Sequence, residues 1–476
     1  MGKLYFLVGS QRLYGPEALD QVRKQSQEMV DNLQKEFEED IQIELLPTVI
    51  DSETCVEDIK IVNNDADCIG IITWMHTFSP AKMWIKGLQI LNKPMLHLHT
   101  QYKRQLPYET IDMDFMNLNQ SAHGDREFGF IVSRLGIAHE VASGYYLDEH
   151  VINRIKRFVR VAKAIQYSKN LKVAMFGNNM RDVSVTDGDR VESQIKYGWE
   201  VNYHAIGDLV ELISEVTEAE VSEKMAEYEE KYEFNTDNID SVKVQAKYEI
   251  ALEKFIEAQG IKAFTDTFED LHGMEQLPGL AVQNLMDKEI GFGPEGDYKT
   301  AALGTVLQVM ARDKAGSTGF IEDYTYDLTQ GEELELASHM LEVPPAFAAE
   351  KPKIEVHPLG IGGKADPARL VFNGVSGKGI QVCMTDMGDH FRLVCADIEL
   401  VEIPKDMPKL PVARILYRHE PNFEIGTTAW LMAGGGHHSI VSTALDSDDI
   451  RLFAHLTGTE CIIIDKNTTE KDYYSF

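Results

Sequence analysis

Acidic and histidine side chains at four separated places along the chain could together bind a divalent metal ion. Glu295 lies in a Gly-Pro-Glu-Gly-Asp sequence that follows an apolar segment, and Glu322 interrupts a strand-like segment. His339 is a polar residue within an apolar run, and the adjacent His437 and His438 follow three glycines. Hard ions such as Mn²⁺ and Mg²⁺ prefer carboxylate ligands, and borderline ions also accept imidazole. These residue types therefore suit a site for such an ion.

Spacing alone does not establish this site, because the four positions match no compact metal-binding motif. A glutamate in a loop is commonly solvated, and a single histidine in a strand is commonly a partly buried structural residue. If their segment is extended, His437 and His438 point in opposite directions, so that only one of them would bind a given ion. The residues by themselves leave open which of the two it is.

Several other classes of function are excluded by motif and by charge. Gly360–Lys364 ends in Gly-Lys, but Pro358 and Ala365 stand where a P-loop needs glycine and serine or threonine. No Gly-x-Gly-x-x-Gly follows a strand, and no Gly-x-Ser-x-Gly nucleophile motif is present. The formal net charge of -31 disfavours nucleic acids and anionic membranes as partners, but it permits a small neutral substrate.

The cysteines and the first residues predict a cytoplasmic protein with reduced thiols. The sequence has 5 cysteines, an odd number, and no Cys-x-x-Cys pair. The apolar run at Leu4–Val8 is short and turns polar, which is typical of a first strand and not of a signal peptide. No apolar run approaches the roughly 20 residues that a membrane-spanning helix needs.

The elements that must position the candidate residues begin with an α/β domain over residues 1–170. Strands are predicted at Leu4–Val8, Ile41–Leu46, Cys68–Met75 and Met95–His99, and helices at Pro16–Phe37, Cys55–Asn64 and Pro80–Leu91. This alternation indicates a doubly wound parallel sheet, in which ligands bind beyond the carboxyl ends of the strands. The loops after the strands are therefore candidate binding segments.

A second α/β series is predicted over residues 171–320, followed by a β-rich domain over residues 321–476. The second series runs from a strand at Lys172–Phe176 to a helix at Asp297–Ala311, with Asp297 as its N-cap. After it, short β-type segments separated by Gly and Pro turns indicate mainly antiparallel sheet. The predicted fold class is therefore α/β, with two doubly wound parallel-sheet domains and a mainly antiparallel β C-terminal domain.

Several longer blocks of this sequence resemble the L-arabinose isomerase family over nearly the whole chain. In the first 130 residues the resembling blocks are Gly9–Glu17, Trp74–Trp84, Ile111–Gln120 and Ser121–Gly129. The later blocks are Val185–Asp189, Thr267–Gly273, Glu295–Leu303, Glu322–Tyr326, Ser338–Glu342 and Gly434–His438. Arg12 is a small departure, since histidine is common at that position in the family.

The resemblance implies a site and a cofactor. It implies Mn²⁺ as the ion, one per subunit, with Co²⁺ or Mg²⁺ as substitutes. The implied ligands are Glu295, Glu322, His339 and, of the two adjacent histidines, His438. It also implies a homo-oligomer, typically a hexamer with active sites between subunits. The implied substrate contacts are Gln11, Leu13, Phe78, His123, Met180 and Phe268.

The implied activity is the interconversion of L-arabinose and L-ribulose, and commonly also of D-galactose and D-tagatose. Hydrogen can move between C1 and C2 as a proton through an enediol or as a hydride. We favour the enediol route, with Glu295 and Glu322 as the proton-transferring groups. The alternatives are a metal-dependent sugar aldolase or lyase on the same ligands, and a non-catalytic sugar-binding protein.

Overall fold

The computed structural model describes residues 2–37, 41–360 and 363–475, so part of the glycine-rich segment Gly360–Lys364 lies outside the described residues. Its backbone forms two compact units. The first consists of Met1–Gln166 with His455–Gly458, and the second of Tyr167–Ala454 with Thr459–Phe476. The predicted domain limits near residues 170 and 320 stay a prediction.

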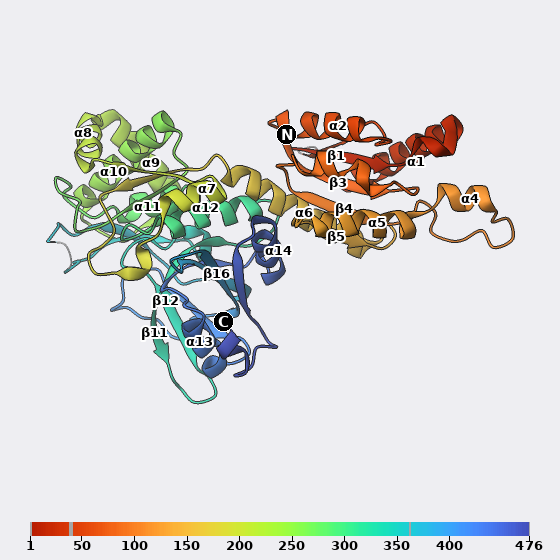
Figure 1. Cartoon of the computed structure of the whole chain (residues 1–476). Helices are drawn as coiled ribbons and strands as arrows, with labels where there is room; N and C mark the ends of the chain where they lie inside the picture. The colour runs from red at the N-terminus through yellow and green to blue at the C-terminus, as the bar shows by residue number, and fades with distance from the viewer. Residues whose placement is uncertain (1, 38–40, 361–362, 476) are drawn as a thin grey trace. The chain divides into compact units, whose positions relative to one another are not determined.

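The first unit contains a five-stranded parallel sheet in the order β2-β1-β3-β4-β5 (Figure 1). All eight residues of β3 are buried, as expected for a continuous apolar strand inside a covered parallel sheet. The predicted parallel α/β arrangement is confirmed, while its doubly wound detail stays a prediction. The strands are β1 (Gly2–Gly9), β2 (Ile41–Leu45), β3 (Cys68–Met75), β4 (Met95–His99) and β5 (Glu140–Ser143).

The helices of the first unit differ from the prediction in two respects: the helices at Met113–Leu118 and Ser121–Arg134 were not predicted, and one predicted helix is broken. The predicted helix at Pro80–Leu91 is wrong, because the structure has only a 3₁₀ turn at Ala81–Met83 and one turn of α-helix, α3 (Ile85–Leu88). Cys55 packs so closely at Gly87, within α3, that a Cβ there would lie 2.4 Å from the Cys55 sulfur and collide with it. The other helices are α1 (Gly15–Gln34), α2 (Ser52–Asn64), α4 (Met113–Leu118), α5 (Ser121–Arg134) and α6 (Glu149–Ser168), which leads into the second unit.

The second unit begins with a parallel sheet in the order β10-β9-β6-β7. Its strands are β6 (Lys172–Phe176), β7 (Glu200–His204), β9 (Ala263–Asp266) and β10 (Gly291–Gly293). The accompanying helices are α7 (Arg190–Tyr197), α8 (Ile206–Glu215), α9 (Glu218–Lys231), α10 (Ile239–Gln259), α11 (Gly279–Asp287) and α12 (Tyr298–Ala311).

Helix α12 is the central element of the second unit. It is largely apolar and nearly all of its residues are buried, because it packs against β9 and β10 and also against β11, β15 and β18 of the following sheet. Its predicted N-cap is confirmed, since the Asp297 carboxylate accepts a hydrogen bond from the main-chain N–H of Thr300. The helix therefore connects the parallel sheet to the β-rich part of the unit.

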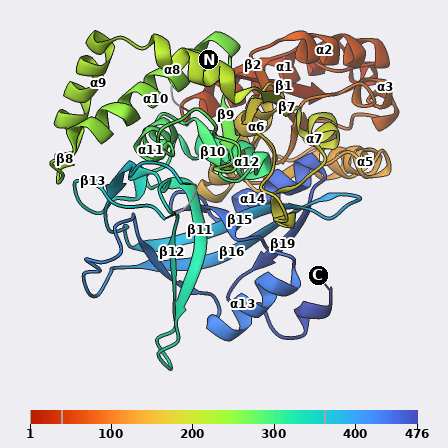
Figure 2. The ribbon, with the colours of Figure 1, turned by 90° about the vertical axis from the view of Figure 1, so that its left-hand side faces the viewer.

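The C-terminal strands form a largely antiparallel barrel, as predicted in outline. Six strands pair in the order β15-β18-β11-β12-β17-β16, and pairing of β15 with β16 closes the ring, with β19 parallel on the outside of β16 (Figure 2). The strands are β11 (Thr318–Asp327), β12 (Leu334–Ser338), β15 (Gly377–Asp386), β16 (Phe391–Val401), β17 (Ile415–His419), β18 (His438–Ser442) and β19 (Glu460–Ile464).

Two features of the C-terminal region differ from simple expectation. Two further strands, β13 (Lys353–Val356) and β14 (Ala368–Val371), lie outside the barrel, because β13 pairs with β14 on one side and with β8 (Glu233–Phe234) on the other. The sequence pattern also did not indicate β18 or helix α13 (Phe423–Met432); helix α14 (Ser447–Thr457) follows β18. All 5 cysteines have free thiols, as expected. No helix in the described ranges is both long and apolar enough to cross a bilayer.

Gly293 offers a test of how closely α12 packs on β10. A Cβ at Gly293 would lie 2.2 Å from the main-chain carbonyl oxygen of Asp297 and 2.8 Å from the main-chain nitrogen of Ala301. Gly293→Ala should therefore destabilise the fold by about 1–3 kcal/mol, because the helix start must shift. Thermal melting measures the effect. Gly207→Ala on α8 is the control, since a Cβ there has no neighbour within 4 Å, and equal melting points for both variants would contradict the packing argument.

Candidate metal centre

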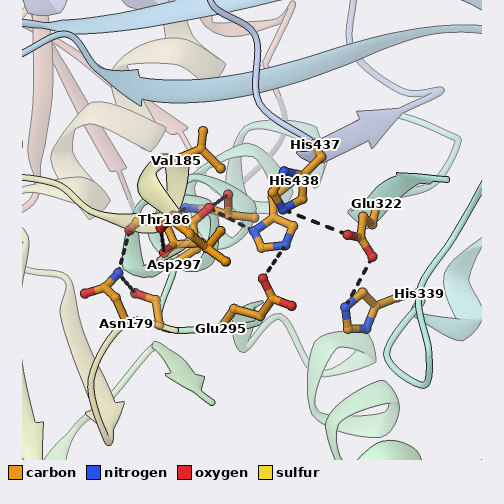
Figure 3. Close-up of polar contacts among 12 residues, drawn as sticks. Asn179, Val185, Thr186, Glu295, Asp297, Glu322, His339, His437 and His438 are labelled. Atoms are coloured by element: carbon orange, nitrogen blue, oxygen red, sulfur yellow. Dashed lines mark hydrogen bonds and ion pairs between the residues drawn. The ribbon is translucent and has the colours of Figure 1, made fainter. Parts of the chain in front are cut away.

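Strand pairing brings the four predicted ligands together in the second unit. Glu322 on the central barrel strand β11 is paired on one side with Ser338, the residue before His339, and on the other side with His438. Glu295 approaches from the loop after β10. Figure 3 shows the four side chains around one space, with Nε2 of His339 3.5 Å from Glu322 and Nε2 of His438 3.8 Å from Glu295.

The Glu295 loop has an unusual backbone that its neighbours hold in place. The backbone angle φ is 61° at Glu295, a positive value that is rare for a residue with a side chain, and it is 82° at Gly296. The Glu295 carbonyl accepts a hydrogen bond from the Met180 N–H at 2.9 Å, and the Gly296 N–H donates to the Asp266 carbonyl at 3.0 Å. The Asn179 side-chain amide donates to the Gly296 carbonyl at 3.0 Å. These bonds fix the direction of the Glu295 side chain.

His438 is buried and is held by a carboxylate on one ring nitrogen. Its Nδ1 lies 3.1 Å from Oδ2 of Asp297, whereas its Nε2 has no hydrogen-bond partner among the described residues. Burial of an imidazole nitrogen without a hydrogen-bond partner is unfavourable, unless a ligand binds to that nitrogen. Histidines that bind metals commonly have the other ring nitrogen held by a carboxylate in this way.

Asp297 is itself fixed by a buried ammonium group. Lys299 Nζ lies 3.0 Å from Oδ1 of Asp297 and donates to the carbonyl groups of Val185, Thr186 and Asp187. Burial by itself would raise the pKa of Asp297, but Lys299 and His438 hold it well below its usual range. The carboxylate is therefore charged and available to orient His438.

The ring of His339, like that of His438, is held by a carboxylate at Nδ1. Its Nδ1 is bonded to the Glu342 carboxylate, which also accepts a hydrogen bond from the Leu341 N–H at 3.2 Å. Burial lowers the pKa of His339, but the carboxylates of Glu342, Glu322 and Glu295 together raise it to about 9. Burial also raises the pKa of Glu322. The set of two carboxylates and two anchored imidazoles fits a divalent ion such as Mn²⁺.

The two adjacent histidines do not point apart as expected from an extended segment. His437 precedes β18, its carbonyl accepts a hydrogen bond from the Asp323 N–H at 3.1 Å, and its ring centroid lies 4.4 Å from that of His438. Glu295, His437 and His438 can bring ligand atoms within 4.8 Å of one another. Burial lowers the pKa of His437 to about 4. Proximity alone therefore allows either histidine, and the Asp297 contact and unpartnered Nε2 favour His438.

A cavity of about 190 Å³ opens beside these residues. The predicted contacts Met180 and Phe268 line it, together with Glu295, Glu322 and His339. Sequence reasoning missed three polar lining residues, Asp266, Tyr324 and Glu342, of which Tyr324 and Glu342 were present only within resembling family blocks. Burial, with a smaller effect of Glu342, raises the pKa of Asp266 to about 8. The other lining residues are Leu271, Leu277, Pro278, Pro294, Met340, Leu341 and Leu359.

The remaining predicted contacts lie in the first unit: Gln11, Leu13 and Phe78 lie in loops that follow β1 and β3, and His123 lies in the first turn of α5. Phe78 stacks on His123 with ring centroids 4.3 Å apart, and Leu13 is 84% exposed. Gln11 begins the short turn that carries Leu13. The two loops meet, since the Thr77 hydroxyl donates to the Ser10 hydroxyl at 2.8 Å. Their position at the carboxyl edge of a parallel sheet agrees with the loops singled out from the sequence; a role in sugar binding stays a prediction.

Comparison with known proteins covers nearly the whole chain. Residues 1–170, 172–313 and 317–460 match the family descriptions L-arabinose isomerase N-terminal domain, central domain and C-terminal domain. An L-arabinose isomerase from Shouchella clausii is 52% identical over 97% of this chain and 95% of its own length. Those of Clostridium beijerinckii and Thermotoga sp. are 50% and 49% identical over 98% and 99% of this chain, and 95% of their own lengths.

Metal titration of two histidine variants tests which of the adjacent residues His437 and His438 binds the metal ion. His438→Ala should weaken Mn²⁺ binding by more than the roughly 10- to 100-fold that loss of an outer-shell partner costs, because a direct ligand is removed. His437→Ala should weaken it less. Isothermal titration of chelator-treated protein measures both affinities, and the reverse ranking would move the ligand by one residue.

Proposed function

The chain belongs to the L-arabinose isomerase family, and we propose that it is a metal-dependent aldose–ketose isomerase that interconverts L-arabinose and L-ribulose. The observation that supports this most directly is that Glu295 and Glu322, which line one cavity, lie close to two histidines whose Nδ1 atoms are held by carboxylates. Conversion of D-galactose to D-tagatose is part of the same proposal.

The proposed cofactor is one Mn²⁺ per subunit, with Co²⁺ or Mg²⁺ as substitutes. Glu295, Glu322, His339 and His438 would hold it. When bound, the ion would act as a Lewis acid on the sugar oxygens at C1 and C2. The carboxylates of Asp297 and Glu342 keep the two histidine rings oriented before the ion arrives.

The proton transfer is proposed to run between the two glutamates and the open-chain sugar. One carboxylate removes the proton from C2 while O1 gains a proton, which gives the enediol. Return of a proton to C1 and loss of the proton on O2 then give the ketose. Several of the residues that line the cavity are apolar, among them Phe268 and Leu341, and they help to keep water away from the proton during transfer.

The rest of the proposal concerns sugar contacts and assembly. Met180 and Phe268, and in the first unit Gln11, Leu13, Phe78 and His123, are proposed to contact the sugar. We also propose a homohexamer, with active sites between subunits, that serves arabinose catabolism in the cytoplasm. Self-association is supported by exposed apolar side chains at and beside α4, namely Leu106, Tyr108, Ile111, Met113 and Met116.

An activity assay tests the function and its dependence on metal. Chelator-treated protein should show little conversion of L-arabinose, and addition of Mn²⁺ should restore it, because the sugar oxygens need a Lewis acid. A coupled assay for L-ribulose measures the rate. Full activity without any divalent ion would contradict the metal dependence, and carbon–carbon cleavage products would favour a lyase.

Substitution of each glutamate tests the proton transfer. Glu295→Gln and Glu322→Gln should each lower kcat by roughly 10²- to 10⁴-fold, the range of general acid–base catalysis, with the fold retained. Exposed Glu211→Gln is the matched control. L-Ribulose formed by the unmodified enzyme in deuterated solvent should also carry deuterium at C1. Normal rates in either variant, or product free of deuterium after long incubation, would count against the enediol route.

A further inference from the structure

The polar groups around the cavity differ in how far they are already engaged. Glu342 is bonded to His339 and to a main-chain N–H. Glu295, Glu322 and His339 are the groups that the proposed function assigns to metal binding and proton transfer. Asp266 is the carboxyl group on this cavity that none of these roles uses.

Asp266 is nine-tenths buried and its carboxyl group has no protein partner. The residue is 9% exposed, and its side chain makes no hydrogen bond or ion pair with any residue in the described ranges. It also lies outside the group of Glu295, His437 and His438 whose ligand atoms approach one another. A buried carboxyl without a partner is unfavourable, so this group is suited to a partner that enters the cavity.

The main chain of Asp266 is rigid and is tied to the Glu295 loop. Asp266 is the last residue of β9, a strand paired with β6 on one side and with β10 on the other. Its carbonyl accepts the hydrogen bond from the Gly296 N–H at 3.0 Å. The position of the Asp266 carboxyl relative to Glu295 is therefore set by the sheet and by this contact, as a specific binding group requires.

The rest of the cavity wall makes Asp266 important for a polyhydroxy ligand. Apart from Tyr324, the remaining wall is mainly apolar, and Leu271, Leu277, Pro278, Leu341 and Leu359 offer no side-chain hydrogen bonds. An open-chain pentose has hydroxyl groups at C3, C4 and C5 that take no part in the hydrogen transfer. Each loses its water on entering an apolar cavity and needs a new partner.

We propose that Asp266 is a substrate-binding residue that forms a hydrogen bond with one of the sugar hydroxyls at C3, C4 or C5. This inference rests on the proposed function, and it gives the cavity a polar group for the part of the sugar remote from the reaction. This hydrogen bond fixes the orientation of the open-chain sugar relative to Glu295 and Glu322.

Binding of a sugar alcohol that cannot react tests the proposal on the intact, Mn²⁺-loaded protein. Asp266→Leu should raise the Kd for L-arabitol by roughly 10- to 100-fold, the effect of one lost hydrogen bond to a buried group, and Asp266→Asn should raise it less. Mn²⁺ affinity should stay unchanged in both. Asp58→Asn is the matched control, because Asp58 on α2 is also buried with an unpartnered Oδ2 but lies in the first unit.

Deoxy sugars identify the hydroxyl that is bound. The loss of kcat/KM for L-arabinose in Asp266→Asn should nearly vanish with the 3-deoxy, 4-deoxy or 5-deoxy analogue that lacks the hydroxyl in question, because the two changes remove the same contact. Wild-type L-arabitol affinity in both Asp266 variants would overturn the inference while leaving the isomerase proposal intact. A parallel loss of Mn²⁺ affinity would overturn it as well, since Asp266 would then support the metal ligands. Failure of the wild-type protein to isomerise L-arabinose or bind L-arabitol would remove the proposed function and this inference together.

Discussion

The buried ion pair between Lys299 and Asp297 is the interaction on which the candidate centre depends. Lys299 is fully buried, and its ammonium group bonds Asp297 and three successive carbonyls from Val185 to Asp187. Asp297 in turn caps α12 and orients His438. Removing one partner of a buried pair typically costs about 3–5 kcal/mol, because the other charge remains buried. One ion pair therefore links the turn at Val185–Asp187, helix α12 and the barrel at the place where the four side chains meet.

Strand β11 supplies the second constraint, because one of its residues lines the cavity and the next one contacts other strands of the barrel. Glu322 faces the candidate ligands, while the next residue, Asp323, is partly buried against the barrel strands β15 and β17. The Asp323 carboxylate accepts hydrogen bonds from Tyr417 at 2.8 Å and from the Gln381 amide at 2.8 Å and 2.9 Å, and burial raises its pKa. Its N–H also holds the carbonyl of His437. The polar interior of the barrel thus fixes the main chain on both sides of Glu322.

Local sequence pattern predicted most elements, but it could not predict how they meet. Alternating apolar segments correctly indicated the parallel strands, and the N-cap role of Asp297 was visible from its position. The helix predicted at Pro80–Leu91 is divided at Trp84 into a 3₁₀ turn and a single α-helical turn, which its periodicity did not indicate. Strand β18 was missed because it begins at a histidine after three glycines, which reads as a loop. Without β18, local sequence pattern does not indicate that Glu322 lies beside His438. Only the family resemblance assigned both residues to one site. Asp266 gave no signal either, since an acid at the end of an apolar strand is commonly solvated.

The order of the barrel strands has a consequence for synthesis of the protein. β11 lies between β12 and β18, and the ribosome makes β18 only after β12, β15, β16 and β17. A nascent chain can therefore carry a folded parallel sheet and a correctly placed Glu295 long before His438 exists. If the centre binds an ion as proposed, such an intermediate would offer it an incomplete set of ligands. Loading of the proposed centre would then follow closure of the barrel.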